Sequence, residues 1–216
     1  MCFLRFVSTT ALLLGCGFCE PALAVIGLQP QVVEINTAPA VVEVTNNGDR
    51  PEYVSIGLSL LLNPGVEYAD EHLETITLVR EPALYAYPFR LSLSPGQTKA
   101  VQIKPLRTVD KETVYRLEVK PVMNLLGSRQ SSPTGKIVVN LAFSGLVRQL
   151  PANKVSSLTV SCESYGARLT ATGNVRYQVK KAQVNGVAID PFNVYPGSPI
   201  SLNGKSVLIP DQPQCQ

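Results

Sequence analysis

Few residues in this sequence could carry out chemistry. His72 is the only histidine among 216 residues, and Glu71 and Glu74 lie beside it in a charged stretch. A histidine between carboxylates can bind a metal ion, but no cysteine and no second histidine supplies the spacing of a zinc site. A catalytic triad would also need this histidine, because imidazole is its usual base. We therefore expect a solvated loop here, with no metal, no cofactor and no enzymatic activity.

The first 24 residues have the features of a secretory signal peptide. Arg5 precedes an apolar stretch at 6–14, and Ala22–Leu23–Ala24 is a cleavage site of small residues. Cleavage after Ala24 leaves 216 − 24 = 192 residues. No later apolar run approaches the roughly 20 residues that a membrane helix needs. We expect an exported protein that is not embedded in a membrane.

The cysteines agree with export. Of the five, only Cys162 and Cys215 remain after cleavage of the signal peptide. Two cysteines in an exported chain most simply form a disulfide, and two unrelated thiols are the alternative. Cys16 follows Leu13–Leu14–Gly15, which leaves open a second reading in which a lipid is attached to Cys16.

The charge is low and scattered. The formal net charge is +3, and it stays +3 after cleavage because Arg5 and Glu20 leave together. No run of Lys or Arg is of the kind that binds nucleic acid. We expect no nucleic-acid partner.

Residues 25–150 consist of short alternating runs broken by Pro, Gly and Asn, and no stretch keeps a helical period. Regularly spaced short strands predict an all-β, immunoglobulin-like sandwich. The expected strands are 31–36, 41–45, 53–62, 75–79, 89–93, 100–103 and 115–119.

The pattern restarts after Pro151. Residues 151–216 predict a second, small β-sandwich, with a tight hairpin at Asn185–Gly186. A unit of this size buries a low fraction of its surface and is marginally stable alone. A disulfide from Cys162 to Cys215 would tie its start to its end.

The strand predicted at 136–144 is the most informative element. One of its faces carries four large apolar side chains, and the other face is mostly small or polar. Such a strand can close its own sheet, or it can donate its apolar row to another protein. The row is Ile137, Val139, Leu141 and Phe143.

The sequence resembles the periplasmic chaperones of chaperone–usher pilus assembly (the PapD-like family). The order of four loose motifs after a signal peptide carries the resemblance, which covers nearly all of the mature chain. The motifs are the early strand 29–34, the turn Leu91–Ser92–Leu93–Ser94–Pro95–Gly96–Gln97, the segment Glu112–Thr113–Val114–Tyr115–Arg116–Leu117, and the end of the alternating strand at 146–151. Gly173–Asn174–Val175–Arg176 and Val194–Tyr195–Pro196–Gly197 resemble a shortened second domain of the family.

The resemblance implies two immunoglobulin-like domains, 25–150 and 151–216, set at an angle in the periplasm. It implies pilus subunits and an outer-membrane usher as partners. Subunits that lack their last strand would receive the apolar row of the chaperone in its place, which is a form of β-strand addition.

The sequence departs from the family where the subunit's terminal carboxylate is bound. The family uses an arginine on the first strand and a lysine near the end of the donor strand. Here the first position falls on Gln31 and the second within 144–146, and neither is basic. The possible anchors are Gln31, which can donate a hydrogen bond without the help of a charge, and Lys136 and Arg116, with Lys120 and Arg148 also available. We expect Arg148 to pair with Glu112 between the domains, and these departures resemble the divergent, alternate (CFA-type) branch.

Two other functions remain as alternatives. A structural pilus subunit or adhesin would also use β-sandwich domains, but it would need an N-terminal donor extension and would lack its last strand. A lipid-anchored binding module would depend on Cys16.

Overall fold

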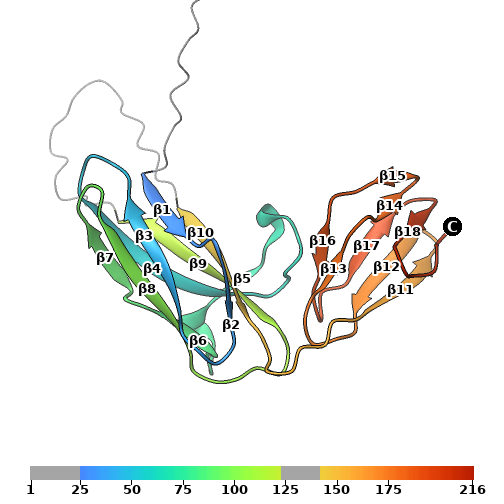
Figure 1. Cartoon of the computed structure of the whole chain (residues 1–216), viewed down its shortest axis with the longest axis horizontal. Coiled ribbons are helices and arrows are strands. Elements are labelled where there is room, and N and C mark those ends of the chain that lie inside the picture. Colours follow the sequence, from blue (N-terminus) through green and yellow to red (C-terminus); the bar gives the residue numbers. More distant parts are fainter. Residues whose placement is uncertain (1–24, 123–141) are drawn as a thin grey trace, which may run out of the picture.

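The computed structural model describes residues 25–122 and 142–216. They form two β-sandwich domains joined at an angle (Figure 1). The predicted signal peptide lies outside the described residues. So do the donor residues Ile137, Val139 and Leu141, and the anchor candidate Lys136.

The first domain packs a four-stranded sheet against a six-stranded sheet. The four-stranded sheet has the order β1 (Ile26–Gln29), β3 (Ala40–Asn46), β8 (Thr98–Pro105) and β6 (Leu84–Tyr87). The six-stranded sheet has the order β2 (Val32–Ile35), β10 (Phe143–Gln149), β9 (Thr113–Pro121), β4 (Glu52–Leu61) and β5 (Leu73–Thr75), and β7 (Arg90–Leu93) also pairs with β4. Two 3₁₀ turns complete the domain, η1 (Tyr68–Asp70) and η2 (Ile76–Leu78).

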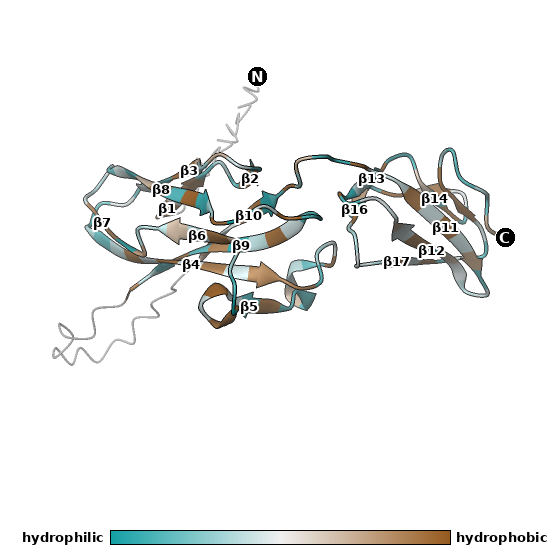
Figure 2. Cartoon of the chain, turned by 90° about the horizontal axis from the view of Figure 1, so that it is seen from below, coloured by the Kyte–Doolittle hydropathy of each residue, from teal (hydrophilic) through white to brown (hydrophobic). Residues whose placement is uncertain are grey.

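Alternation of apolar and polar residues produces the core of this domain. Along β3, Val42 and Val44 are fully buried while Val41 and Glu43 between them are exposed. Figure 2 shows hydrophobic and hydrophilic bands alternating along the strands in the same way. Successive side chains of a strand point to opposite faces, so one apolar row from each sheet enters the space between the two sheets.

The N-terminal segment of the domain passes from the four-stranded sheet, as β1, to the six-stranded sheet, as β2. β1 pairs with β3, and β2 pairs in parallel with β10, with Val32 opposite Leu146 and Glu34 opposite Arg148. β9 pairs with β10 along its whole length, from Phe143 to Gln149. Because β2 pairs with β10 only from Leu146 onward, it covers only the second half of that strand. Among the described residues, the first half of β10 has a partner strand on one side only.

The second domain is built from shorter strands around its own core. One sheet has the order β11 (Leu158–Glu163), β12 (Gly166–Ala171) and β17 (Ile200–Asn203), and β13 (Tyr177–Val179) pairs with β16 (Phe192–Val194). A third sheet has the order β15 (Val187–Ala188), β14 (Gln183–Val184) and β18 (Val207–Leu208). Asn185 and Gly186 join β14 to β15 with φ of 52° and 78°, as the predicted hairpin requires.

The predicted disulfide between Cys162 and Cys215 is confirmed, with an S–S distance of 2.03 Å. Cys162 lies on β11, and Cys215 is buried in the core of the second domain beside Val207. The bond therefore fixes the C-terminal segment, which contributes little other regular structure, onto the strand that begins the domain.

Replacing both cysteines with serine will destabilise the second domain. The bond closes a loop with a sequence separation of 53 residues. Loop-closure entropy for that length is about 4 kcal/mol of unfolding free energy. Urea unfolding of wild type and of the double variant measures the difference. Wild type treated with a reductant should lose the same amount, and an unchanged midpoint in both would contradict the prediction.

Candidate functional site: an open strand edge and the interdomain cleft

The described part of β10 separates its side chains into two rows. Gly145, Val147 and Gln149 are buried toward the core, and Phe143 packs against the same core cluster. Ser144, Leu146 and Arg148 alternate with them on the opposite face, and Leu146 packs there with Tyr195 of the second domain. Phe143, the last residue of the predicted donor row, therefore continues the core-facing row of β10.

A groove of about 400 Å³ lies beside the uncovered half of β10, between that strand and β1. Phe143 and Ser144 form one wall, and residues from Ile26 to Gln31 form much of the other. The hydroxyl oxygen of Ser144 is buried and has no hydrogen-bond partner among the described residues. Unpaired strand edges readily accept another strand.

Gln31 lies next to the segment 144–146, where the resemblance places the second basic residue of the family. Its backbone carbonyl accepts a hydrogen bond of 2.8 Å from the amide of Leu146. The two positions at which the family has its basic pair are thus neighbours in space. Gln31 is exposed and Leu146 is half-buried, and neither is charged.

Arg116 already has a carboxylate partner. It projects from β9 and makes two hydrogen bonds to Glu71, with its Nε 2.8 Å from Oε2. The hydrogen bond to Glu71 raises the pKa of Arg116, although burial opposes the shift. Glu71, which the sequence placed beside His72 in a solvated loop, is only 5% exposed at its side chain. Glu71 therefore neutralises Arg116, and this candidate anchor is not a free cation.

The expected interdomain pair of Glu112 and Arg148 needs correction. Arg148 Nε lies 4.0 Å from Glu112 Oε1, but both residues belong to the first domain. The cation that reaches Glu112 from the second domain is Arg176, with Nη1 2.7 Å from Oε1. In the sequence, Arg176 is only the last residue of the motif at 173–176, and no role is predicted for it.

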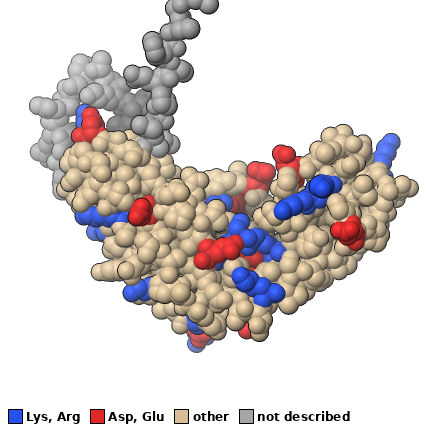
Figure 3. Space-filling view, viewed as in Figure 1, with Lys and Arg blue, Asp and Glu red and all other residues tan. Residues whose placement is uncertain are grey.

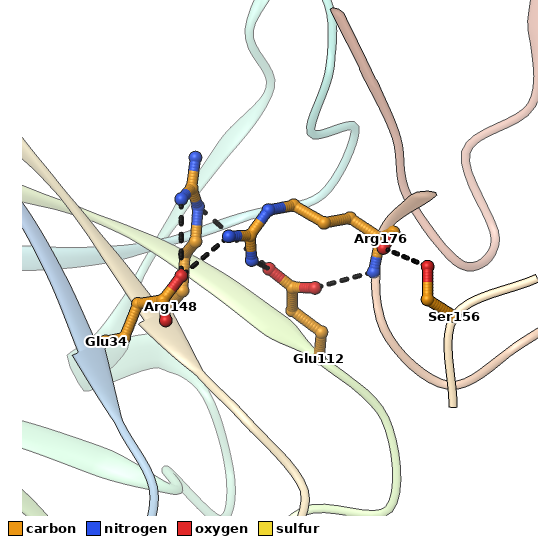
Figure 4. A network of polar contacts seen from close by, with 5 residues as sticks. All are labelled: Glu34, Glu112, Arg148, Ser156 and Arg176. Carbon is orange, nitrogen blue, oxygen red and sulfur yellow. Dashed lines mark hydrogen bonds and ion pairs between the residues drawn. The ribbon is translucent and has the colours of Figure 1, made fainter. Parts of the chain in front are cut away.

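Arg176 joins the domains through a compact network (Figure 4). Its Nη2 lies 2.6 Å from Glu34 Oε1, and its backbone amide donates to Glu112 Oε2 at 2.7 Å. Its own carbonyl accepts from the hydroxyl of Ser156 at 2.9 Å. Burial lowers the pKa of Arg176, but its bonds to the two carboxylates outweigh burial and raise it. The side chain of Glu112 is 0% exposed, so its carboxylate has no contact with water. The bonds from Arg176 take the place of the hydrogen bonds that water would donate to it.

The network should weaken in acid through Glu34. The hydrogen bond from Arg176 lowers the pKa of Glu34 from 4.5, although burial opposes it. A carboxyl whose pKa is lowered by folding stabilises the protein fully above its unfolded pKa, and this contribution is lost as the pH falls through the folded value. We expect wild type to lose more stability than Glu34→Gln between neutral pH and pH below 4.5, measured by urea unfolding at each pH. Parallel curves would contradict the prediction.

Asn174 fixes the linker between the domains. Its carbonyl accepts from the amide of Glu112 at 2.8 Å, and its side chain accepts from the amide of Val155 at 2.7 Å and donates to Asn153 at 2.7 Å. Gly173 lets the two chain segments approach this closely, because a Cβ there would lie 2.1 Å from the carbonyl oxygen of Val155. The linker is therefore held by specific bonds rather than left free.

A small apolar contact supports the same junction. Tyr195 of the second domain packs with three residues of the first, Leu61, Val114 and Leu146. Beside it, Gly65 adopts a φ of 102°, and a Cβ there would lie 3.2 Å from the carbonyl oxygen of Asn193. The domains thus meet through a polar network and an apolar contact, which together restrict their angle.

Two hollows lie in the cleft between the domains, of about 380 and 250 Å³. Arg148 and Asn193 line both of them. Figure 3 shows positive and negative side chains gathered together at this concave region. The cleft is therefore polar and charged, whereas no charged residue among those described lines the groove beside Phe143.

The comparisons with known proteins point to fimbriae. No protein-family profile matches the chain. A CS1 fimbrial protein of Escherichia coli, named as one of the fimbrial subunits, is 28% identical over 145 residues, covering 65% of this chain and 60% of that protein. A CFA/I fimbrial protein of the same organism, also named as one of the subunits, is 26% identical over 145 residues, covering 64% and 59%. The chain thus spans about 60% of the length of these curated relatives.

Solved structures of fimbrial chaperones have the same fold. The class 5 fimbriae chaperone CfaA superposes with a TM-score of 0.65 at 23% identity, covering 85% of this chain and 90% of that one. A chain from a chaperone–tip adhesin complex of CFA/I fimbriae gives a TM-score of 0.66 at 22% identity, covering 86% and 94%. The periplasmic chaperone SfaE gives 0.56 at 14%, covering 84% and 89%. This chain therefore has the two-domain, immunoglobulin-like fold of the fimbrial chaperones. In the described ranges, no helix is long and apolar enough to cross a membrane.

Proposed function

We propose that this protein is a periplasmic chaperone that binds fimbrial subunits by donating a β-strand and delivers them to an outer-membrane usher. The uncovered half of β10 carries the proposal. β9 pairs with it on one side, and β2 reaches no further than Leu146 on the other. Beside that edge lies the groove formed by Phe143, Ser144 and β1. A client strand added there would extend the sheet and satisfy its open backbone groups.

The donated side chains proposed are Ile137, Val139, Leu141 and Phe143. They alternate in sequence with the same phase as Val147, which is buried in the core. Covering a large apolar side chain contributes roughly 1.5–3 kcal/mol, so four contribute on the order of 6–12 kcal/mol before ordering costs. A subunit that lacks its last strand exposes an apolar groove, and such a groove promotes aggregation. Filling the groove with the donated row would protect the subunit from aggregation.

The alternative of a structural subunit fits the fold less well. A subunit that waits for a donor strand would lack the last strand of its sandwich. Here β10 pairs with β9 over seven residues and completes the first domain from within the chain. A second domain follows, and both domains have their own cores. The lipid-anchored alternative depends on Cys16, which lies outside the described residues.

Periplasmic co-expression with fimbrial subunits tests the proposed function. We expect each bound subunit to be recovered as a soluble one-to-one complex with this protein and to be degraded or aggregated without it. When an usher is added, subunits should appear in fibres and this protein should not. Its incorporation into fibres would instead support a structural subunit, and failure to stabilise any subunit would refute the chaperone function.

A further inference from the structure

The second domain has an open strand edge of its own. β13 pairs with β16 on one side, and these two strands form a sheet by themselves. Among the described residues, no backbone hydrogen bond joins β13 to a strand on its other side. The backbone groups along that side are therefore available to an added strand.

A groove of about 320 Å³ lies beside this edge. One wall is the strand and the two residues that follow it, 177–181, and the other wall is the segment 209–211. Successive side chains of a strand point to opposite faces, yet residues of both faces line the groove, so it follows the edge of the strand. All of its residues belong to the second domain, and only Gln178 is shared with a hollow of the interdomain cleft.

The groove has a net positive charge. Lys180 and Lys181 line it and are exposed, and neither forms an ion pair within the described part of the chain. Asp211, on the other wall, is the only carboxylate that lines this groove among the described residues. Lysine at a strand edge disfavours pairing with an apolar or a basic strand, whereas an acidic strand gains an opposite-charge pair across the ladder. The edge therefore favours an acidic strand over the others.

Lys181 is held at the end of this edge by an unusual backbone conformation. Its φ is 56°, in the left-handed region where glycine is favoured and a lysine side chain is strained. Asp211 has a φ of 61°, and in the described ranges the only other non-glycine residue with a positive φ is Asn185 of the hairpin. Strained residues other than glycine gather where their side chains are used. Here Lys181 and Asp211 line the same groove from opposite walls.

We propose that the edge of β13 binds an extended, acidic segment of a partner protein by β-strand addition. The backbone of the segment pairs with β13, its carboxylates lie beside Lys180 and Lys181, and its side chains cover Pro210. Charge complementarity selects the segment, and the backbone ladder holds it. This site goes beyond the proposed function, because it uses neither the donor row nor the edge of β10.

The test uses the purified protein and three short synthetic peptides. The first alternates Thr with Glu, the second replaces each Glu with Gln, and the third keeps the Glu residues but has a proline at its centre. We expect the first to bind about tenfold more tightly than the second, which lacks the charge, and than the third, because proline cannot donate to a ladder. Only the first should slow hydrogen exchange of backbone amides within 177–181.

Two variants locate the attraction. Lys180→Glu should weaken binding of the Thr–Glu peptide at least tenfold, because it replaces an attraction with a repulsion. Lys205→Glu makes the same change of charge in the same domain, at an exposed residue that does not line the groove, and should bind the peptide like wild type. Lys180 is also exposed, so the unfolding midpoints of both variants should stay close to that of wild type.

Several results would overturn the proposal. Equal binding of the first and third peptides would show charge attraction without a ladder, and equal binding of the first and second would show that charge selects nothing. Binding of no peptide, or equal loss in Lys180→Glu and Lys205→Glu, would also refute the site. A dimer of the protein alone that Lys180→Glu dissociates would assign the edge to a second copy instead. The peptide comparisons use wild type only, and none of these results bears on the chaperone function.

Discussion

Replacing Val139 with aspartate is expected to reduce at least tenfold the recovery of soluble fimbrial subunits. Val139 is the second residue of the proposed donor row and lies outside the described residues. In a client groove, aspartate at this position would lack the apolar contacts of valine, which are worth roughly 1.5–3 kcal/mol. It would also be a buried charge without a partner. Each 1.4 kcal/mol is a factor of ten in affinity. Co-expression of each variant with the subunit, followed by quantification of the soluble complex, measures the effect.

Asn140→Asp is the matched control for this substitution. It introduces the same aspartate one residue further along, where alternation assigns the side chain to the polar face. We expect near wild-type recovery of the subunit from this variant. The unfolding midpoint of both chaperone variants should stay close to that of wild type, which separates loss of binding from loss of folding. Equal recovery from Val139→Asp and Asn140→Asp would rule out donation through this row.

The sandwich architecture could be predicted because burial in strands has a period of two. Val42 and Val44 are buried and Glu43 is exposed, as the alternating sequence requires. The strand expected at 75–79 was wrong in detail, because β5 ends at Thr75 and η2 follows. Leu78 is 76% exposed there, so its apolar character did not indicate burial. Local pattern does not reveal whether a partner strand is present.

The interdomain contacts were harder to predict because they join residues that are distant in sequence. Glu112 and Arg148 were identified from charge and motif position, and they do lie near each other. Nothing in the local sequence distinguishes Arg176 from the other arginines. Its role appears only in the fold, where the backbone bond between Asn174 and Glu112 brings Arg176 to that carboxylate. The same holds for Tyr195, whose contact with Leu61 depends on which face of the second domain meets the first.

Replacing Arg176 with methionine is expected to lower the free energy of unfolding by about 3 kcal/mol. The substitution keeps much of the apolar stem but removes both ion pairs to the first domain. Glu112, with a 0% exposed side chain, would keep only the backbone amide at 2.7 Å and the distant Nε of Arg148 at 4.0 Å. Urea unfolding measures the loss, and small-angle scattering should show a wider range of angles between the domains.

Two further variants establish that the loss comes from a buried, unpaired charge. Adding Glu112→Gln to Arg176→Met should restore part of the stability, because glutamine is uncharged and its oxygen can still accept from the backbone amide. Lys120→Met breaks the pair of Lys120 and Glu118, which are 2.9 Å apart with side chains 53% and 21% exposed. Exposed pairs contribute about 1 kcal/mol or less, so this control should change little. If Lys120→Met and Arg176→Met lower the free energy of unfolding by the same amount, the ion pairs of Arg176 contribute no more than a surface ion pair. The domain angle would then have to depend on the Asn174 linker bonds and the packing of Tyr195.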